Sequence, residues 1–191
     1  MNICLASGSA RRLELLQALG HEVRVLTPGI QEISQISTAN WAHLASLNAR
    51  LKAEHIYEHK GLLDSDFILG ADTIVVLDNY LFGKPRDNTH AKAILGQLSG
   101  KNHQVITGFC LINNHDKRER FVVSQVRFRP LSPEEIDNYL LLGESLDKAG
   151  AYGIQGAGAA LIKSIEGSVT NIIGLPIAEV LHEAKLLLNG R

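Results

Sequence analysis

The chain has 191 residues, of which 45% are hydrophobic and 20% charged, and its formal net charge at pH 7 is −1. This length and composition are typical of one globular domain, residues 1–191, rather than of a disordered chain or a coiled coil. The charge argues against nonspecific nucleic-acid binding, which needs a basic face, and no apolar run approaches the length of a membrane span. We therefore expect a cytoplasmic protein with neither nucleic acid nor membrane as a partner.

Apolar strand-like runs alternate with amphipathic segments along the chain, which predicts an α/β fold. The predicted strands are 3–6, 21–26, 67–77, 103–112, 121–128 and 159–166, and the predicted helices are 10–19, 41–59, 88–98, 133–142 and 175–188. A hairpin turn is predicted at 78–81 and a loop at 167–174. The strands on either side of the charged turn 113–120 alternate in polarity, which indicates an antiparallel pair.

The two cysteines, Cys4 and Cys110, lie in apolar runs without the spacing of metal ligands. This predicts buried free thiols in a reducing compartment.

The first predicted strand leads through Ser7, Gly8 and Ser9 into a helix whose first turn carries Arg11 and Arg12. The serines supply turn chemistry and a hydroxyl for the helix N-cap. Two cations at the positive end of a helix dipole are unfavourable unless an anion is bound nearby. Backbone N–H groups, hydroxyls and guanidinium groups at one helix N-terminus therefore indicate a phosphate site, although a solvated, serine-capped helix start explains these residues equally well.

Asp72 interrupts the most apolar run of the chain, residues 67–77. A carboxylate in a buried strand costs free energy unless it is paired, hydrogen-bonded or bound to a metal. The alternative is an Asp that ends one strand and caps the following turn. The cost of burial favours a functional carboxylate over that alternative.

Three other features carry weaker signals. Lys84 has a backbone restricted by its glycine and proline neighbours, but a lone lysine in a turn is usually solvated. The glycine-dense segment 147–158 has neither a dinucleotide fingerprint nor a P-loop, and Gln155 within it offers an amide that could read a base edge; a flexible connector is the alternative. His55 and His59 have metal-ligand spacing, but a solvated helix end explains them better.

Several blocks follow one another in an order that carries a resemblance to a known family. They are Leu5-Ala6-Ser7-Gly8-Ser9-Ala10-Arg11-Arg12, Gly70-Ala71-Asp72-Thr73, Gly83-Lys84-Pro85, Leu98-Ser99-Gly100, His103, Thr107-Gly108, Asp147-Lys148-Ala149-Gly150-Ala151-Tyr152-Gly153-Ile154-Gln155-Gly156 and Gly174-Leu175-Pro176. Over essentially the whole chain, the sequence resembles the Maf family of nucleoside triphosphate pyrophosphatases. So many blocks in family order are highly specific.

The resemblance implies a mixed, twisted sheet flanked by helices, with two lobes around a central cleft as in inosine triphosphatase, and a homodimer. It also implies hydrolysis of a nucleoside triphosphate to the monophosphate and pyrophosphate with a divalent metal, Mg²⁺ or alternatively Mn²⁺. The general base of the family falls on Asp72. The phosphate-binding residues match Ser7, Ser9, Arg11, Arg12 and Lys84, and Glu32 and Lys52 fall where the family has further cleft residues. Arg11, Thr73 and Gln155 are similar to the branch that acts on dTTP and UTP rather than on a methylated GTP.

General chemistry agrees with these roles. Arginine and lysine side chains stabilise the charge of departing pyrophosphate, and Mg²⁺ needs only one or two carboxylates besides waters and phosphates. Glu32 and Asp72 are the expected metal ligands, and Asp72 is also the expected acceptor of a proton from the attacking water. The sequence leaves both roles of Asp72 open.

The chain departs from the family pattern at Ala10, where a proline normally precedes the two arginines, and at Val169, where an aromatic residue is frequent. Alanine keeps the helix but removes the restricted φ at its first position. Two other functions stay open: a nucleotide-binding regulator of septum formation and cell division without essential catalysis, and an enzyme of the same reaction that clears modified nucleotides. Two acids near a polyanion disfavour plain binding unless a metal lies between them, which favours the enzyme.

Overall fold

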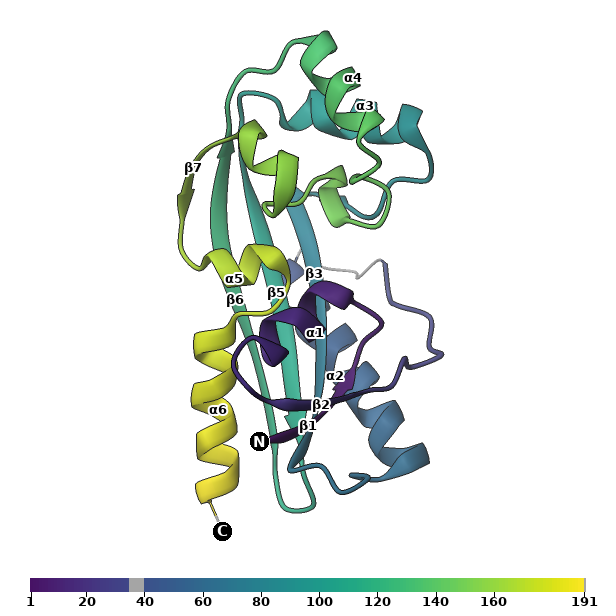
Figure 1. Cartoon of the computed structure of the whole chain (residues 1–191), viewed down its shortest axis with the longest axis vertical. Helices are drawn as coiled ribbons and strands as arrows, with labels where there is room; N and C mark the ends of the chain where they lie inside the picture. The colour runs from purple at the N-terminus through teal and green to yellow at the C-terminus, as the bar shows by residue number, and fades with distance from the viewer. Residues whose placement is uncertain (35–39, 191) are drawn as a thin grey trace. The chain divides into compact units, whose positions relative to one another are not determined.

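The computed structural model describes residues 1–34 and 40–190, and strands and helices are interspersed along the chain (Figure 1). The strands are β1 (Asn2–Ala6), β2 (Glu22–Val25), β3 (Phe67–Leu77), β4 (Tyr80–Phe82), β5 (Asn102–Ile112), β6 (Lys117–Phe128) and β7 (Ile162–Glu166). The helices are α1 (Ala10–Gln17), α2 (Trp41–Lys60), α3 (Asn88–Leu98), α4 (Pro133–Leu141), α5 (Val169–Ile173) and α6 (Ile177–Asn189), with 3₁₀ helices η1 (Ala149–Ala151) and η2 (Gly156–Leu161). The α/β class is confirmed.

The seven strands form one mixed sheet in the order β2-β1-β3-β5-β6-β7, with β4 paired to β3 beside this path. β1 is parallel to β2 and β3, whereas the pairs β3–β4 and β6–β7 are antiparallel. Residues 113–116 join the neighbouring strands β5 and β6, and a connection this short excludes a parallel crossover. These two strands are therefore antiparallel, as predicted. The predicted hairpin turn has positive φ at Asp78 and Asn79, which suits a tight β-hairpin.

The chain divides into two compact units, each assembled from segments that are distant in the sequence. Unit 1 comprises residues 1–73, 107–122 and 174–191, and unit 2 comprises residues 74–106 and 123–173. Strands β3, β5 and β6 each contribute residues to both units. The single domain expected over 1–191 and the cleft expected between two lobes stay predictions.

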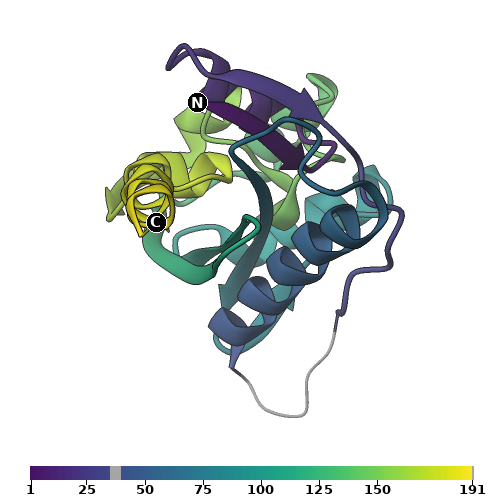
Figure 2. The same cartoon turned by 90° about the horizontal axis from the view of Figure 1, so that it is seen from below.

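In unit 1, helices cover both faces of the sheet because successive strand side chains point to opposite faces. Helices α2 and α6 lie on opposite sides of the strands (Figure 2). The face toward α1 and α6 buries Ile3, Leu5, Leu16, Phe67, Leu69, Ala71, Phe109, Leu111, Leu175, Val180, Ala184 and Leu187. The face toward α2 buries Cys4, Ala6, Ala49, Ala53, Ile56, Ile68, Cys110 and Ile112. Asp72 and Ile68 are four residues apart on β3, so their side chains point to the same face of the sheet, the face toward α2.

Helix α2 lies directly against the sheet at two glycines. A Cβ atom at Gly70 would lie 2.1 Å from the carbonyl oxygen of Ala49, and one at Gly108 would lie 2.3 Å from the backbone nitrogen of Ser46. Only a residue without a side chain permits such an approach of backbone to backbone. The two glycines therefore set the separation between α2 and the sheet, and with it the reach of α2 side chains toward Asp72.

Unit 2 has a hydrophobic core of its own, in which the two helices α3 and α4 contact each other. The predicted start of α4 is confirmed by a capping box: the Ser132 hydroxyl accepts from the Glu135 N–H, and the Glu135 carboxylate accepts from the Ser132 N–H. The buried side chains are Val75, Leu77, Phe82, Ala91, Ile94, Leu95, Leu98, Val105, Val126, Phe128, Ile136, Tyr139, Leu140, Ala151, Tyr152 and Leu161.

The structure corrects the sequence-based prediction at several element boundaries. Helix α1 ends at Gln17, β6 begins at Lys117, and β7 begins at Ile162 because the residues before it form η2. The predicted loop at 167–174 contains the short helix α5. Its buried Asn171 donates to the Val105 carbonyl and to the Ser124 hydroxyl, so contacts with distant residues hold this helix in place.

The two cysteines agree with the sequence-based expectation of buried free thiols. Cys4 and Cys110 are free and buried. Among the helices of the described residues, none is long and apolar enough to cross a membrane.

Candidate active site

Asp72 lies in the middle of β3 and is almost completely buried. One of its carboxylate oxygens lies 2.7 Å from the Lys52 ammonium nitrogen, and the other accepts a hydrogen bond of 3.1 Å from the Asn48 amide. Asn48 and Lys52 are four residues apart on α2, so both project from one face of that helix. The buried carboxylate is thus both paired and hydrogen-bonded, and these contacts offset the cost of its burial.

Lys52 joins Asp72 to a second carboxylate, that of Glu32. The Lys52 ammonium nitrogen lies 2.5 Å from a Glu32 carboxylate oxygen and also donates to the Ala71 carbonyl oxygen at 3.3 Å. The side chain of Glu32 is 54% exposed, whereas that of Lys52 is 8% exposed. A lysine between two carboxylates therefore forms the centre of the site in unit 1.

Asn48 holds the segment that carries Glu32. Its side-chain oxygen accepts from the Ile33 N–H at 2.9 Å, and its amide nitrogen donates to the Ile33 carbonyl oxygen at 3.0 Å. The sequence analysis did not identify Asn48. Its position one helical turn before Lys52, between the apolar residues of the same helix face, indicates that both side chains point to the same place. The rest of the polar segment, residues 35–39, lies outside the described residues.

Arg12 is buried at the start of α1 and connects three parts of unit 1. Its guanidinium donates to the Ser7 hydroxyl at 2.8 Å, to the Gly174 carbonyl oxygen at 2.8 Å and to the Thr73 hydroxyl at 3.0 Å. Burial lowers the pKa of Arg12, while the charges of Asp72 and Glu32 act in the opposite direction. A guanidinium stays charged even so. The Thr73 hydroxyl also lies 2.9 Å from that of Thr107. Arg12 thus brings Ser7 and Thr73 together.

Ser9 and Arg11 lie beside this cluster at the N-terminus of α1. Ser9 is the N-cap residue, but its side chain makes no capping hydrogen bond, which corrects the expectation that its hydroxyl caps the helix. Its N–H donates to the Ser7 hydroxyl at 3.2 Å instead. Arg11 is half-buried in the first turn. The hydroxyl of Ser9 is therefore not engaged in capping α1.

Lys84 and Gln155 are the two predicted substrate-binding residues in unit 2. Both are exposed; Lys84 follows β4, and Gln155 directly precedes η2. The Gly150 N–H donates to the Gly83 carbonyl oxygen at 3.2 Å, which ties the segments of these two residues together. Their approach to Asp72 stays a prediction.

Glu32 and Asp72 are suited in chemistry to a hard cation. Both carboxylates contact the same ammonium group, so they converge on one position. Among residues 1–34 and 40–190, no group of three or more His, Cys, Asp or Glu side chains could hold a metal alone. Two carboxylates suffice for Mg²⁺ only when waters and substrate phosphates supply the other ligands. His55 and His59 instead contact each other at the end of α2, with ring centroids 4.2 Å apart.

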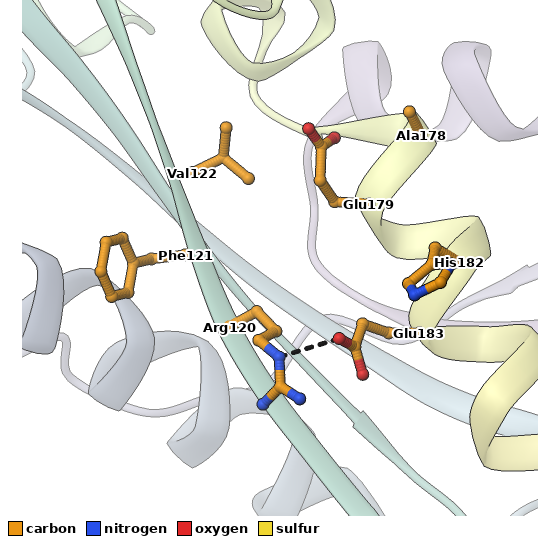
Figure 3. A pocket seen from close by; sticks show the side chains of 7 residues that line it. All are labelled: Arg120, Phe121, Val122, Ala178, Glu179, His182 and Glu183. Atoms are coloured by element: carbon orange, nitrogen blue, oxygen red, sulfur yellow. Dashed lines mark hydrogen bonds and ion pairs between the residues drawn. The ribbon is translucent and has the colours of Figure 1, made fainter.

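A separate pocket of about 310 Å³ lies between β6 and α6 in unit 1 (Figure 3). In it, the Arg120 guanidinium donates to the Glu183 carboxylate at 2.8 Å. Its lining residues are Arg120, Phe121, Val122, Ala178, Glu179, His182 and Glu183. None of these was predicted as a site residue, and no predicted site residue lines this pocket.

Comparisons with known proteins show which sequences and structures this chain is similar to. A family model described as "Maf-like protein" matches residues 2–187. A "dTTP/UTP pyrophosphatase" of Clostridioides difficile (strain 630) is 44% identical, over 94% of this chain and 92% of the relative. Proteins of the same name from Salmonella typhimurium (strain LT2) and Carboxydothermus hydrogenoformans are 44% and 41% identical, over 92% and 97% of this chain and 87% and 98% of the relatives.

A solved structure, that of the Staphylococcus aureus Ham1 protein, superposes with a TM-score of 0.49 at 12% identity. The match covers 85% of this chain and 80% of that one.

Proposed function

Because this chain belongs to the Maf family, we propose that it hydrolyses a nucleoside triphosphate, with dTTP and UTP preferred, to the nucleoside monophosphate and pyrophosphate. The observation that carries the proposal is the buried Asp72, which Lys52 and Asn48 hold. The same unit contains Arg12 with its partners Ser7, Thr73 and Gly174. A plain binding protein needs the basic groups but has no use for a buried, oriented carboxylate.

The basic and hydroxyl groups at the start of α1 bind the phosphates in this proposal. Ser7, Ser9, Arg11 and Arg12 offer hydroxyl and guanidinium donors at one helix N-terminus, and Lys84 adds a cation from unit 2. Pyrophosphate leaves with charge spread over its oxygens, and fixed cations stabilise that charge without reorganising. Because Arg12 already has three acceptors in the protein, its guanidinium is held in orientation before substrate arrives.

Asp72 is the group that accepts a proton in the reaction. A water oxygen attacks the α-phosphorus, the bond to the bridging oxygen of pyrophosphate breaks, and the water's proton passes to the Asp72 carboxylate. The contacts with Lys52 and Asn48 fix the orientation of that carboxylate. Lys52 acts in the same proposal as a substrate-side cation once phosphates are bound.

Glu32 and Asp72 would hold a divalent cation, Mg²⁺ or alternatively Mn²⁺, together with the substrate phosphates. Such a cation neutralises phosphate charge and so supports departure of pyrophosphate. Lys52 lies between both carboxylates, so the proposal requires the ammonium group to move aside when the cation arrives.

The preference for a pyrimidine base rests on the names of the relatives and on the resemblance of Arg11, Thr73 and Gln155 to the branch that acts on dTTP and UTP. Thr73 contacts Arg12 and Thr107, and Gln155 is exposed on unit 2 with an amide that can pair with a base edge. Clearance of modified nucleotides belongs to the same proposal, since it uses the same reaction. A homodimer is expected as well, and so is a cytoplasmic location, for which the buried free thiols of Cys4 and Cys110 are the support.

The test is pyrophosphate release by the purified chain with Mg²⁺, Mn²⁺ or a chelator, across dTTP, UTP, CTP, ATP, GTP and methylated variants. Selective, metal-dependent turnover of dTTP and UTP is the expected result. Asp72→Asn is expected to remove turnover while nucleotide binding, measured by calorimetry, is largely retained. Wild-type turnover in Asp72→Asn would contradict its role as base, and tight binding without turnover by the wild type would indicate a regulatory nucleotide-binding protein instead.

A further inference from the structure

A buried hydrogen bond in unit 2 anchors the loop that carries Gln155. The Tyr152 hydroxyl and the Nε2 atom of His103 lie 2.7 Å apart, and the two residues are 5% and 1% exposed. His103 belongs to β5, whereas Tyr152 lies in the glycine-dense segment 147–158. The bond thus ties this segment to a strand of the sheet.

Ring packing reinforces the same anchor. The Tyr152 ring meets the Phe128 ring edge to face, with centroids 4.7 Å apart and an interplanar angle of 74°, and His103 packs against both rings. Such contacts between perpendicular rings add to the stabilisation from burial alone. The side chain of Tyr152 therefore has one well-defined position.

The His103 imidazole forms a hydrogen bond with Tyr152, and the proposed reaction assigns it no chemical step. Among the described residues, its Nδ1 atom is buried without a hydrogen-bond partner. Burial lowers the pKa of His103 to about 4, so the ring is neutral at pH 7. A neutral, fully buried imidazole is suited to structural positioning and not to proton transfer with substrate.

The loop beyond Tyr152 closes on itself, with Gln155 between the two contact points. A Cβ atom at Gly158 would lie 2.0 Å from the Gly153 carbonyl oxygen, so these two backbone segments touch. The Gly153 N–H donates to the Tyr139 hydroxyl at 3.4 Å. Gly150, which has a φ of 72°, packs against Val75. The segment is therefore an ordered loop and not the flexible connector that the sequence left open.

Gln155 is exposed, and within residues 1–34 and 40–190 no hydrogen bond of its side chain is found. Its amide is available to a ligand, and the backbone of the loop sets the region that this amide can reach. Tyr152 is three residues from Gln155, so the His103–Tyr152 bond is one of the contacts that hold this short stretch of backbone.

We propose that His103 and Tyr152 are positioning residues for base recognition, because their hydrogen bond holds the loop from which Gln155 meets the pyrimidine edge. The inference rests on the proposed function and assigns two residues that do not touch substrate. Uracil and thymine present an acceptor where cytosine presents a donor. A glutamine amide has both a donor and an acceptor, so it can pair with either base when it rotates by 180°. Discrimination between uracil and cytosine therefore requires that the loop hold Gln155 where only one of the two pairings forms.

The test compares kcat and KM for UTP and CTP in Tyr152→Phe, which keeps the ring and removes the hydroxyl. We expect the UTP over CTP ratio of kcat/KM to fall about tenfold, mainly through a higher KM for UTP, with kcat changed less than about twofold. His103→Met, which also loses the bond, is expected to behave alike. His103→Gln, whose amide can reach the Tyr152 hydroxyl, is expected to keep most of the selectivity. The matched control is Tyr57→Phe, which removes a tyrosine hydroxyl that donates to the Asn114 side chain. This variant should not change the UTP over CTP ratio of kcat/KM.

A double-mutant cycle separates positioning from general destabilisation. In a Gln155→Ala background, Tyr152→Phe should leave the UTP over CTP ratio unchanged, because the residue through which it acts is gone. An unchanged ratio in Tyr152→Phe alone, or an equal further fall in the Gln155→Ala background, would overturn the inference. A wild type without pyrophosphate release would instead overturn the proposed function, so the two failures are distinguishable.

Discussion

The ammonium group of Lys52 lies 2.7 Å from a carboxylate oxygen of Asp72, and the two side chains are 8% and 9% exposed. The pair connects α2 to β3, and Asn48 and Glu32 complete it on either side. A buried ion pair is stable as a unit, but the removal of one partner leaves a buried charge without compensation.

Lys52→Met is therefore expected to lower the free energy of unfolding by about 3 kcal/mol, since it leaves Asp72 charged and buried. The double variant Lys52→Met/Asp72→Asn should recover a large part of that loss, because neither charge then remains. Urea unfolding monitored by circular dichroism measures the losses in these two variants and in the single variant Asp72→Asn. Losses in the double variant equal to the sum of the two single losses would contradict a coupled pair.

Gly70→Ala is expected to lower the free energy of unfolding by about 2–3 kcal/mol, because the added methyl group meets the backbone of α2. The same displacement should weaken the contacts of Lys52 and Asn48 with Asp72, so turnover should fall as well. Gly96→Ala on α3 is the matched control. Nothing lies within 4 Å of a Cβ atom there, and alanine should stabilise the helix by about 0.5–1 kcal/mol. A Gly70→Ala protein as stable as the wild type would contradict the close approach of α2.

Acid is expected to destabilise the protein through His103. The pKa of this residue is lowered by burial from 6.5 to about 4, so between these values the unfolded chain binds a proton that the folded chain does not. Stability therefore falls as the pH falls from about 6.5 to about 4, by up to about 3 kcal/mol, and this contribution levels off below pH 4. The variant His103→Gln has no titratable side chain at this position, so it lacks this contribution to the pH dependence of stability.

The measurement for this prediction is the difference in unfolding free energy between wild type and His103→Gln at several pH values from 7.5 to 4. Contributions from the other titrating groups cancel in that difference. The wild type should lose stability relative to the variant as the pH is lowered, and a difference independent of pH would refute the buried neutral state.

Cys4 and Cys110 are expected to resist thiol reagents in the folded protein. Both are fully buried, and burial raises the pKa of the Cys110 thiol to about 12, so its thiolate is scarce at neutral pH. Titration with an aromatic disulfide reagent at pH 8 should therefore detect no fast-reacting thiol before denaturant is added. Both thiols should react in denaturant, and rapid reaction without it would show that one of the strands β1 and β5 opens readily.

The sequence alone predicted most of the secondary structure and singled out Asp72 as a candidate functional residue. Periodicity placed β3 at Phe67–Leu77 and α2 from Trp41, because a doubly buried strand and a long helix have strong local patterns. Asp72 stood out because a carboxylate in such a strand needs a partner. The short helix α5 was missed, since a segment of this length is stabilised by contacts such as those of Asn171 and not by its own propensity.

Only the tertiary structure decided which groups meet. Lys52 and Asp72 are 20 residues apart in the sequence, and their contact depends on Gly70 and Gly108 allowing α2 to approach the sheet. Likewise, the sequence left Arg12 as either a phosphate ligand or part of a solvated helix start. In the fold, its guanidinium donates to three acceptors of the protein and connects Ser7, Thr73 and Gly174. Residue types and local periodicity can be read from the sequence. Contacts between distant residues depend on how the backbone of one element packs against that of another, and no local pattern encodes this packing.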